Sequence, residues 1–173
     1  MRVRPEAESE FATYFAARRD AVRRSAYLLC GDWHRADDVA QTAFVKLHRH
    51  WDSVRDKGAL DAWMRRTVVR AVVDESRRPW RRERASAVLP EPVAAGDDPG
   101  DAMAQREQVL AALAAVPPRQ RAVLVLRFLE DADVATTAVA LGCSEGTVKS
   151  QTARGLVALR AALAGSEADD GRA

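Results

Sequence analysis

The fold is decided by the stretch DVATTAVALGCSEGTVKSQTARGLVALRAAL, residues 133–163. Its apolar spacing predicts two helices joined by a tight turn. Gly142 is expected to end the first helix in the left-handed conformation, and Ser144 to cap the second. The small residue Ala138, the glycine turn and the β-branched Val148 fall at the offsets of a helix-turn-helix. The stretch therefore predicts a helix-turn-helix unit.

The second helix of this unit has an apolar face and a polar face. A core stripe recurs at helical spacing, and a polar stripe is centred about 140° away from it. The polar side chains are hydrogen-bonding types that can reach base edges in a major groove. In an isolated helix we would interpret such a stripe as a solvated face, but the adjoining turn favours DNA binding. The polar stripe consists of Thr147, Ser150, Gln151 and Arg154.

Composition indicates an all-α protein. The chain has 173 residues, of which 47% are hydrophobic and 30% charged, and no alternating strand pattern of convincing length is found. Its two cysteines, Cys30 and Cys143, are too few for a disulfide framework or a metal cluster. No apolar run approaches membrane-spanning length and no signal-peptide pattern is found, so we expect a cytoplasmic protein without membrane insertion.

The distribution of charge divides the chain. The net charge is only +2, but residues 60–84 hold eight arginines against four acids, and residues 85–103 hold four acids and no base. The second stretch is also rich in Pro and Gly, as in a flexible linker. We expect two small helical domains, 9–84 and 104–164, joined by this acidic linker and followed by a disordered tail, 165–173. The expected helices are 10–30, 34–51, 59–77, 101–115 and one reaching 129, before the helix-turn-helix. Gly31 is expected to end the first of them, and Asp32 to cap the second.

Three strings in these domains resemble one family, the extracytoplasmic-function class of sigma-70 RNA polymerase sigma factors. ADDVAQTAFVKLHRHW (36–51) looks like the helix that binds the polymerase clamp. DAWMRRTVVRAVVDESRRPWRR (61–82) is similar to the helix that reads the promoter −10 element. LAALAAVPPRQRAVLVLRFLED (110–131) with LGCSEGTVKSQTARGLVALR (141–160) resembles region 4, which reads the −35 element. The resemblance implies a promoter-specificity subunit whose partners are core polymerase, through its β and β′ subunits, and promoter DNA.

The resemblance implies that the second helix binds core polymerase. By their spacing Phe44 and Leu47 face inward and build the domain, so Asp38, Gln41 and Lys46 are the better contact candidates. The implied set is Asp37, Asp38, Gln41, Phe44, Lys46 and Leu47.

The resemblance also implies DNA contacts in both domains. The loop and helix start at 53–63 match the segment that captures a flipped −10 base, which costs a few kcal/mol of unstacking. Phosphate contacts position a protein, whereas base contacts specify. The implied −10 contacts are Lys57, Trp63, Arg65, Arg66 and Arg70. The implied −35 contacts are Thr147, Lys149, Ser150, Gln151 and Arg154, with phosphate contacts from Arg119 and Arg121.

Arg70 and Thr137 are among the residues at which the sequence departs from the family. The family often has asparagine where Arg70 stands, so the −10 base preference is expected to differ. The helix before the turn has Thr137 where the family favours isoleucine, which predicts poorer packing at a cost of about 1 kcal/mol.

Two other function classes, a stand-alone regulator and an enzyme, fit the sequence less well. A stand-alone helix-turn-helix regulator would bind duplex DNA without polymerase, usually as a dimer, but the basic, Trp-containing third helix fits single-stranded DNA better. An enzyme is disfavoured because the sequence shows no phosphate loop, metal constellation or nucleophile with a nearby base, so no catalytic residue or cofactor is expected. The resemblance further suggests a regulatory anti-sigma partner.

Overall fold

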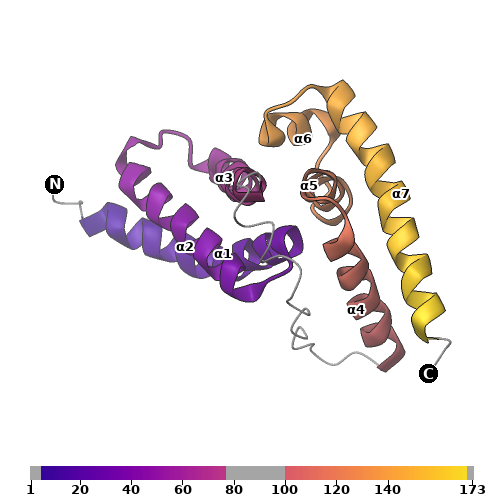
Figure 1. The fold of residues 1–173 in the computed structure, drawn as a ribbon. Helices are drawn as coiled ribbons and strands as arrows, with labels where there is room; N and C mark the ends of the chain where they lie inside the picture. Colours follow the sequence, from indigo (N-terminus) through magenta and orange to yellow (C-terminus); the bar gives the residue numbers. More distant parts are fainter. Residues whose placement is uncertain (1–4, 77–99, 171–173) are drawn as a thin grey trace.

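The computed structural model describes residues 5–76 and 100–170, and all regular structure in these ranges is helical. The all-α prediction is confirmed. Figure 1 shows an N-terminal unit, α1–α3, beside a C-terminal unit, α4–α7. The bounds are α1 (Pro5–Cys30), α2 (Trp33–His50), η1 (Trp51–Ser53), η2 (Lys57–Ala59), α3 (Leu60–Ser76), α4 (Gly100–Ala115), α5 (Pro118–Leu124), η4 (Val125–Leu129), α6 (Val134–Leu141) and α7 (Glu145–Asp170).

The turn between α1 and α2 forms as the sequence predicts. Gly31 has φ +72° and ends α1, and its N–H donates to the carbonyl of Tyr27 at 2.7 Å. The Asp32 side chain then caps α2 by accepting from the N–H of Arg35 at 3.0 Å. At the other end, α1 begins at Pro5 and not near residue 10, because proline suits the first helical position.

The C-terminal unit contains one element that periodicity did not predict. The helix expected to reach residue 129 is α-helical only to Leu124 and continues as the π-helical turn η4. The N–H of Glu130 closes this turn on the carbonyl of Val125 at 3.0 Å. An extra residue in the turn changes the direction in which the following residues point.

One hydrophobic core joins the two units. It combines buried side chains of α1–α3, such as Leu29, Leu47 and Val69, with Val116 and Leu126 of the C-terminal unit. Helix α3 packs against α5 and α6, and α1 packs against α4. The expected domains therefore lie directly against each other in this structure.

The expected linker and tail are only partly described. Residues 85–99 lie outside the described residues, and the last four linker residues, 100–103, begin α4. At the C-terminal end, α7 continues to Asp170 and so includes the first residues of the expected tail. No proline interrupts this stretch, and its single glycine, Gly165, costs a helix only about 1 kcal/mol.

Candidate nucleic-acid interface

The helix-turn-helix is built as predicted. Gly142 has φ +62° and ends α6, and the N–H of Cys143 donates to the carbonyl of Ala138 at 3.0 Å. Ala138, Val148 and Val123 of α5 form one buried cluster that fixes the angle between α6 and α7. The Asp133 side chain caps α6, and this hydrogen bond to the N–H of Thr136 lowers the pKa of Asp133.

Thr137 packs better than expected. It is fully buried, and its hydroxyl donates to the carbonyl of Asp133 at 2.8 Å. A buried hydroxyl with a partner avoids most of the desolvation cost that motivated the expectation.

The predicted base-reading stripe lies on the outer side of α7. Lys149, Ser150 and Arg154 are exposed, and Thr147 and Gln151 are half-buried. The Ser144 hydroxyl caps the helix by accepting from the N–H of Thr147 at 3.1 Å. The stripe therefore starts at a well-formed helix N-terminus and is open to solvent.

The two predicted phosphate contacts have different environments. Arg119 is exposed at the start of α5, whereas Arg121 is 9% exposed. The Arg121 guanidinium donates to the carbonyls of Leu29, Ala114 and Val116 at 3.2, 2.5 and 3.0 Å. Burial lowers the pKa of Arg121, yet an arginine stays charged at neutral pH. In this arrangement Arg121 is a structural side chain that is closed to DNA, and only Arg119 can meet a phosphate.

The predicted −10 residues lie on the segment before α3 and on α3 itself. Lys57 is exposed, and its ammonium lies 3.6 Å from the centroid of the Trp51 ring. Trp63, Arg65 and Arg66 are half-buried on α3, and Arg70 is exposed one turn further on.

Two of these arginines face the C-terminal unit. The Nε of Arg65 donates to the carboxylate of Glu130 at 2.8 Å. A Cβ at Gly142 would lie 3.4 Å from Nη2 of Arg70, so Arg70 reaches the turn of the helix-turn-helix. Sequence reasoning missed Glu130, because nothing along the chain pairs it with a residue 65 positions earlier.

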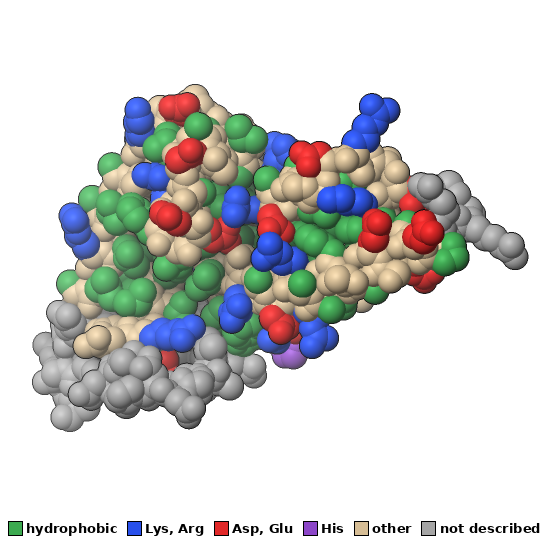
Figure 2. Space-filling view, turned by 180° about the vertical axis from the view of Figure 1, so that it is seen from behind, with side chains coloured by type: hydrophobic (Ala, Val, Ile, Leu, Met, Phe, Trp, Pro, Cys, Tyr) green, Lys and Arg blue, Asp and Glu red, His purple; other side chains and the backbone are tan. Residues whose placement is uncertain are grey.

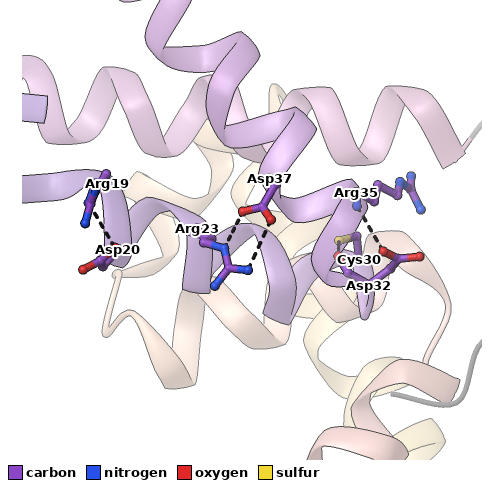
Figure 3. A network of polar contacts seen from close by, with 7 residues as sticks. All are labelled: Arg19, Asp20, Arg23, Cys30, Asp32, Arg35 and Asp37. Carbon is purple, nitrogen blue, oxygen red and sulfur yellow. Dashed lines mark hydrogen bonds and ion pairs between the residues drawn. The ribbon is translucent and has the colours of Figure 1, made fainter. Parts of the chain in front are cut away.

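The predicted polymerase-binding residues divide by burial. Asp37, Asp38, Gln41 and Lys46 are exposed on α2, whereas Phe44 and Leu47 are buried, as their spacing predicts. Asp37 points towards Arg23 of α1 and accepts two hydrogen bonds from its guanidinium (Figure 3). These hydrogen bonds lower the pKa of Asp37. Of the six predicted polymerase-binding residues, the four polar ones are therefore accessible to a partner, and the two apolar ones belong to the hydrophobic core.

A groove of about 790 Å³ runs between α1 and α2 beside these residues. Its lining includes Phe15 and Val45, which are 37% and 44% exposed, together with Arg19, Asp37 and Gln41. An apolar floor with a charged rim is typical of a protein-docking surface.

Within residues 5–76 and 100–170, no group of three His, Cys, Asp or Glu side chains could hold a metal ion. None of the helices described there is long and apolar enough to cross a membrane.

Known proteins match both units. Residues 4–82 match the family described as Sigma-70 region 2, and residues 106–159 match Sigma-70, region 4. The chain is 38% identical over 163 residues to an RNA polymerase sigma-E factor of Streptomyces avermitilis, covering 92% of this chain and 88% of the relative. It is 35% identical over 147 residues to the ECF RNA polymerase sigma factor SigM of Mycobacterium tuberculosis, covering 83% and 72%.

The chain belongs to the extracytoplasmic-function (ECF) class of the sigma-70 family. Its N-terminal unit is region 2 and its C-terminal unit is region 4. Because both units match sigma regions, this ECF sigma factor is a polymerase-associated factor and not a stand-alone regulator.

The fold of this ECF sigma factor also has a solved counterpart. The sigma factor RpoE of Bartonella quintana, crystallised with the anti-sigma factor NepR, superposes with a TM-score of 0.68 at 22% identity. The match covers 89% of this chain and 96% of that one. The two proteins share the arrangement of helices in both regions.

Proposed function

We propose that this ECF sigma factor binds core RNA polymerase through its β and β′ subunits and directs initiation by reading two promoter elements. Region 4 reads the −35 element with α7, and region 2 opens and reads the −10 element with α3 and the loop before it. The chain supplies recognition and no catalysis.

The observation that carries the proposal is the polar stripe of α7. Its members Ser150 and Arg154, and the adjacent Lys149, are exposed on a helix held by the buried Val148. A helix held in this way can enter a major groove with its N-terminal residues against base edges. Arginine reads guanine through two hydrogen bonds, and each such pair contributes about 1–3 kcal/mol of discrimination.

The −10 contacts are proposed on α3 and on the loop that precedes it. The loop carries Lys57, which lies against the buried Trp51, and leads to the half-buried Trp63, so a cation and a partly accessible aromatic ring lie within one short segment. Aromatic side chains stack on unpaired bases, and cations hold the strand backbone. Arg65, Arg66 and Arg70 extend the proposed surface along α3.

The groove between α1 and α2 is proposed as the surface that meets core polymerase. Asp38, Gln41 and Lys46 are exposed on α2, and the groove offers the apolar area that a stable complex needs. Figure 2 shows acidic and basic side chains interspersed on the face of the molecule that it draws.

A regulatory partner is the remaining part of the proposal. The structural counterpart RpoE was solved with an anti-sigma factor bound. We expect this chain to be held inactive by a protein that covers both regions, as a pull-down under several growth conditions would test. Recovery of polymerase subunits alone under every condition would count against such a partner.

The test is transcription in vitro with core polymerase and DNA from upstream of the chain's own gene. The expected result is a discrete transcript that core alone does not make. Arg154→Ala should reduce it about tenfold or more, as loss of a base contact predicts, and Lys149→Ala should also weaken it. The matched control is Arg160→Ala, which removes an exposed arginine from another face of the same helix.

Two outcomes would contradict the proposal. Equal losses from Arg154→Ala and Arg160→Ala would mean that the stripe does not read DNA. A chain that does not co-elute with core, but binds duplex DNA alone, would remove the polymerase-dependent role.

A further inference from the structure

A carboxylate of region 4 reaches into region 2. Glu130 accepts a hydrogen bond from the Ser25 hydroxyl of α1 and one from Nε of Arg65 on α3, the second at 2.8 Å. Only 14% of the Glu130 side chain is exposed, against 30% of Arg65. A charge pair as shielded as this is screened less by salt than an exposed one.

The backbone before Glu130 holds the carboxylate in this position. The π-helical turn η4 ends at Leu129, and Asp131 then adopts φ +51°, a left-handed conformation that is uncommon outside glycine. The chain reverses there and continues towards α6. Glu130 thus lies at the tip of a bend that points at α1 and α3.

Glu130 pairs with Arg65, which we propose as a contact for promoter DNA. Carboxylate and phosphate oxygens bind a guanidinium in the same way. Beside the pair lies a cavity of about 280 Å³, lined by Tyr14, Arg18 and Asp61 as well as by Arg65 and Glu130. While Arg65 holds Glu130 in this way, its Nε cannot hold the backbone of a DNA strand.

Further contacts hold the same arrangement. Arg121 of region 4 donates to the carbonyl of Leu29 at the end of α1, and Arg70 of region 2 reaches Gly142 in the turn before α7. Buried side chains of both regions also share one hydrophobic core. The two DNA-reading helices are therefore held through direct contact between their domains.

This closed arrangement is incompatible with binding both promoter elements. The elements are named for positions about 25 base pairs apart, which corresponds to about 85 Å of duplex at 3.4 Å per pair. In the structure, α3 packs directly on α6 of the helix-turn-helix. The regions must separate before both elements are read.

We propose that Glu130 latches region 4 onto region 2 by taking the place of a DNA phosphate at Arg65, so that the free chain holds itself closed. This inference rests on the proposed function for the meaning of Arg65, but the latch itself can be measured without transcription. Core polymerase and DNA then open the chain by offering Arg65 a phosphate and by binding each region separately.

The first test measures the shape of the full-length chain by small-angle X-ray scattering. The closed wild type should have a radius of gyration of about 16 Å, as a compact chain of this length has. Glu130→Gln should raise it, and Glu130→Arg, which repels Arg65, should raise it by a few ångströms (roughly 3 Å or more). Asp131→Asn is the matched control, because it removes the same charge one position away.

The second test measures binding to a fluorescein-labelled 12-nucleotide single strand at low salt. Glu130→Gln should bind it about threefold to tenfold more tightly than the wild type, because Arg65 is released. Asp131→Asn should show only the smaller gain that any lost negative charge brings.

A charge swap separates the latch from a general loss of stability. The double variant Arg65→Glu with Glu130→Arg restores an ion pair of opposite polarity and should return the scattering to the closed value. Its DNA binding should remain weak, because Arg65 belongs to the proposed DNA surface. A swap that stays as expanded as Glu130→Arg alone would overturn the latch.

The latch and the proposed function fail in different ways. Scattering and oligonucleotide binding unchanged by Glu130→Gln, beside normal core-dependent transcription, would overturn the latch alone. Opening by Glu130→Gln in a chain that never supports transcription would keep the latch and remove its promoter role. Equal effects of Glu130→Gln and Asp131→Asn would also overturn it, since charge alone would then explain them.

Discussion

The two DNA-reading helices of this ECF sigma factor, α7 and α3, differ in how their DNA-binding side chains are engaged within the chain. On α7, Lys149, Ser150 and Arg154 face solvent. On α3, Arg65 is paired with Glu130, and Arg70 reaches Gly142 of the other region. Both helices carry arginines suited to DNA, but on α3 the guanidinium of Arg65 is already paired with a carboxylate of the other region. Availability for DNA thus depends on what packs against a helix as well as on its residue types.

The largest expected effect comes from breaking the closed arrangement at Arg121. Arg121→Met keeps a long side chain but leaves the carbonyls of Leu29 and Val116 without this donor. A loss of buried hydrogen bonds to a charged group should lower the free energy of unfolding by about 2–4 kcal/mol. Urea unfolding followed by circular dichroism measures it.

Arg119→Met is the control for Arg121→Met. Arg119 is exposed two positions earlier, so its replacement should change stability by no more than about 0.5 kcal/mol. If the two variants lose the same stability, the buried role of Arg121 is refuted.

A smaller effect is expected at the turn that orients the open helix, α7. Gly142 has φ +62°, and Gly142→Ala should cost about 1–2 kcal/mol because a side chain disfavours that conformation. Gly165→Ala, at a helical position with nothing within 4 Å of a new Cβ, should instead stabilise the chain by up to about 1 kcal/mol. Thermal unfolding compares the two, and a stabilising Gly142→Ala would contradict the structure.

The smallest effect is expected at the ion pair between Arg23 and Asp37, which joins α1 and α2 within region 2. The hydrogen bond from Arg23 holds the pKa of Asp37 below its usual value of 3.8. A carboxylate with a lowered pKa contributes stability above its unfolded pKa and loses it as the pH falls through the folded one. About half of each side chain is exposed, so the contribution is at most about 1 kcal/mol.

Unfolding between pH 2.5 and 7 measures this contribution. Asp37→Asn should be less stable than the wild type at pH 7, and the difference should shrink below pH 4. Asp38→Asn, at an exposed position on the same helix, is the control. A difference that persists unchanged at pH 2.5 would argue against the ion pair.

Local features of the fold could be predicted from the sequence with good accuracy. Gly142 takes the left-handed conformation expected of it, Gly31 ends α1 as expected, and Asp32 and Ser144 cap the helices that follow. The inward position of Phe44 was also correct. Each of these depends on residues within about one helical turn, so the necessary information is contiguous in the chain.

The sequence was less informative about where an α-helix changes its geometry and where it ends. The π-helical turn η4 keeps the apolar composition of an α-helix, so periodicity did not reveal it. The helix α7 reaches Asp170, beyond the expected start of the tail at residue 165, because no proline interrupts that stretch. The DNA roles assigned to single residues remain predictions that the variants above test.

By itself the sequence determined the helices, the helix-turn-helix and the family, because these are written in short-range spacing and in contiguous motifs. Only the tertiary structure decided that Arg121 is buried while Arg119 is free, and that Arg65 meets Glu130. Arg121 lies 92 residues along the chain from its partner Leu29, and Arg65 lies 65 residues from Glu130. Such contacts depend on how completed helices pack, and one arginine resembles another until its neighbours are in place.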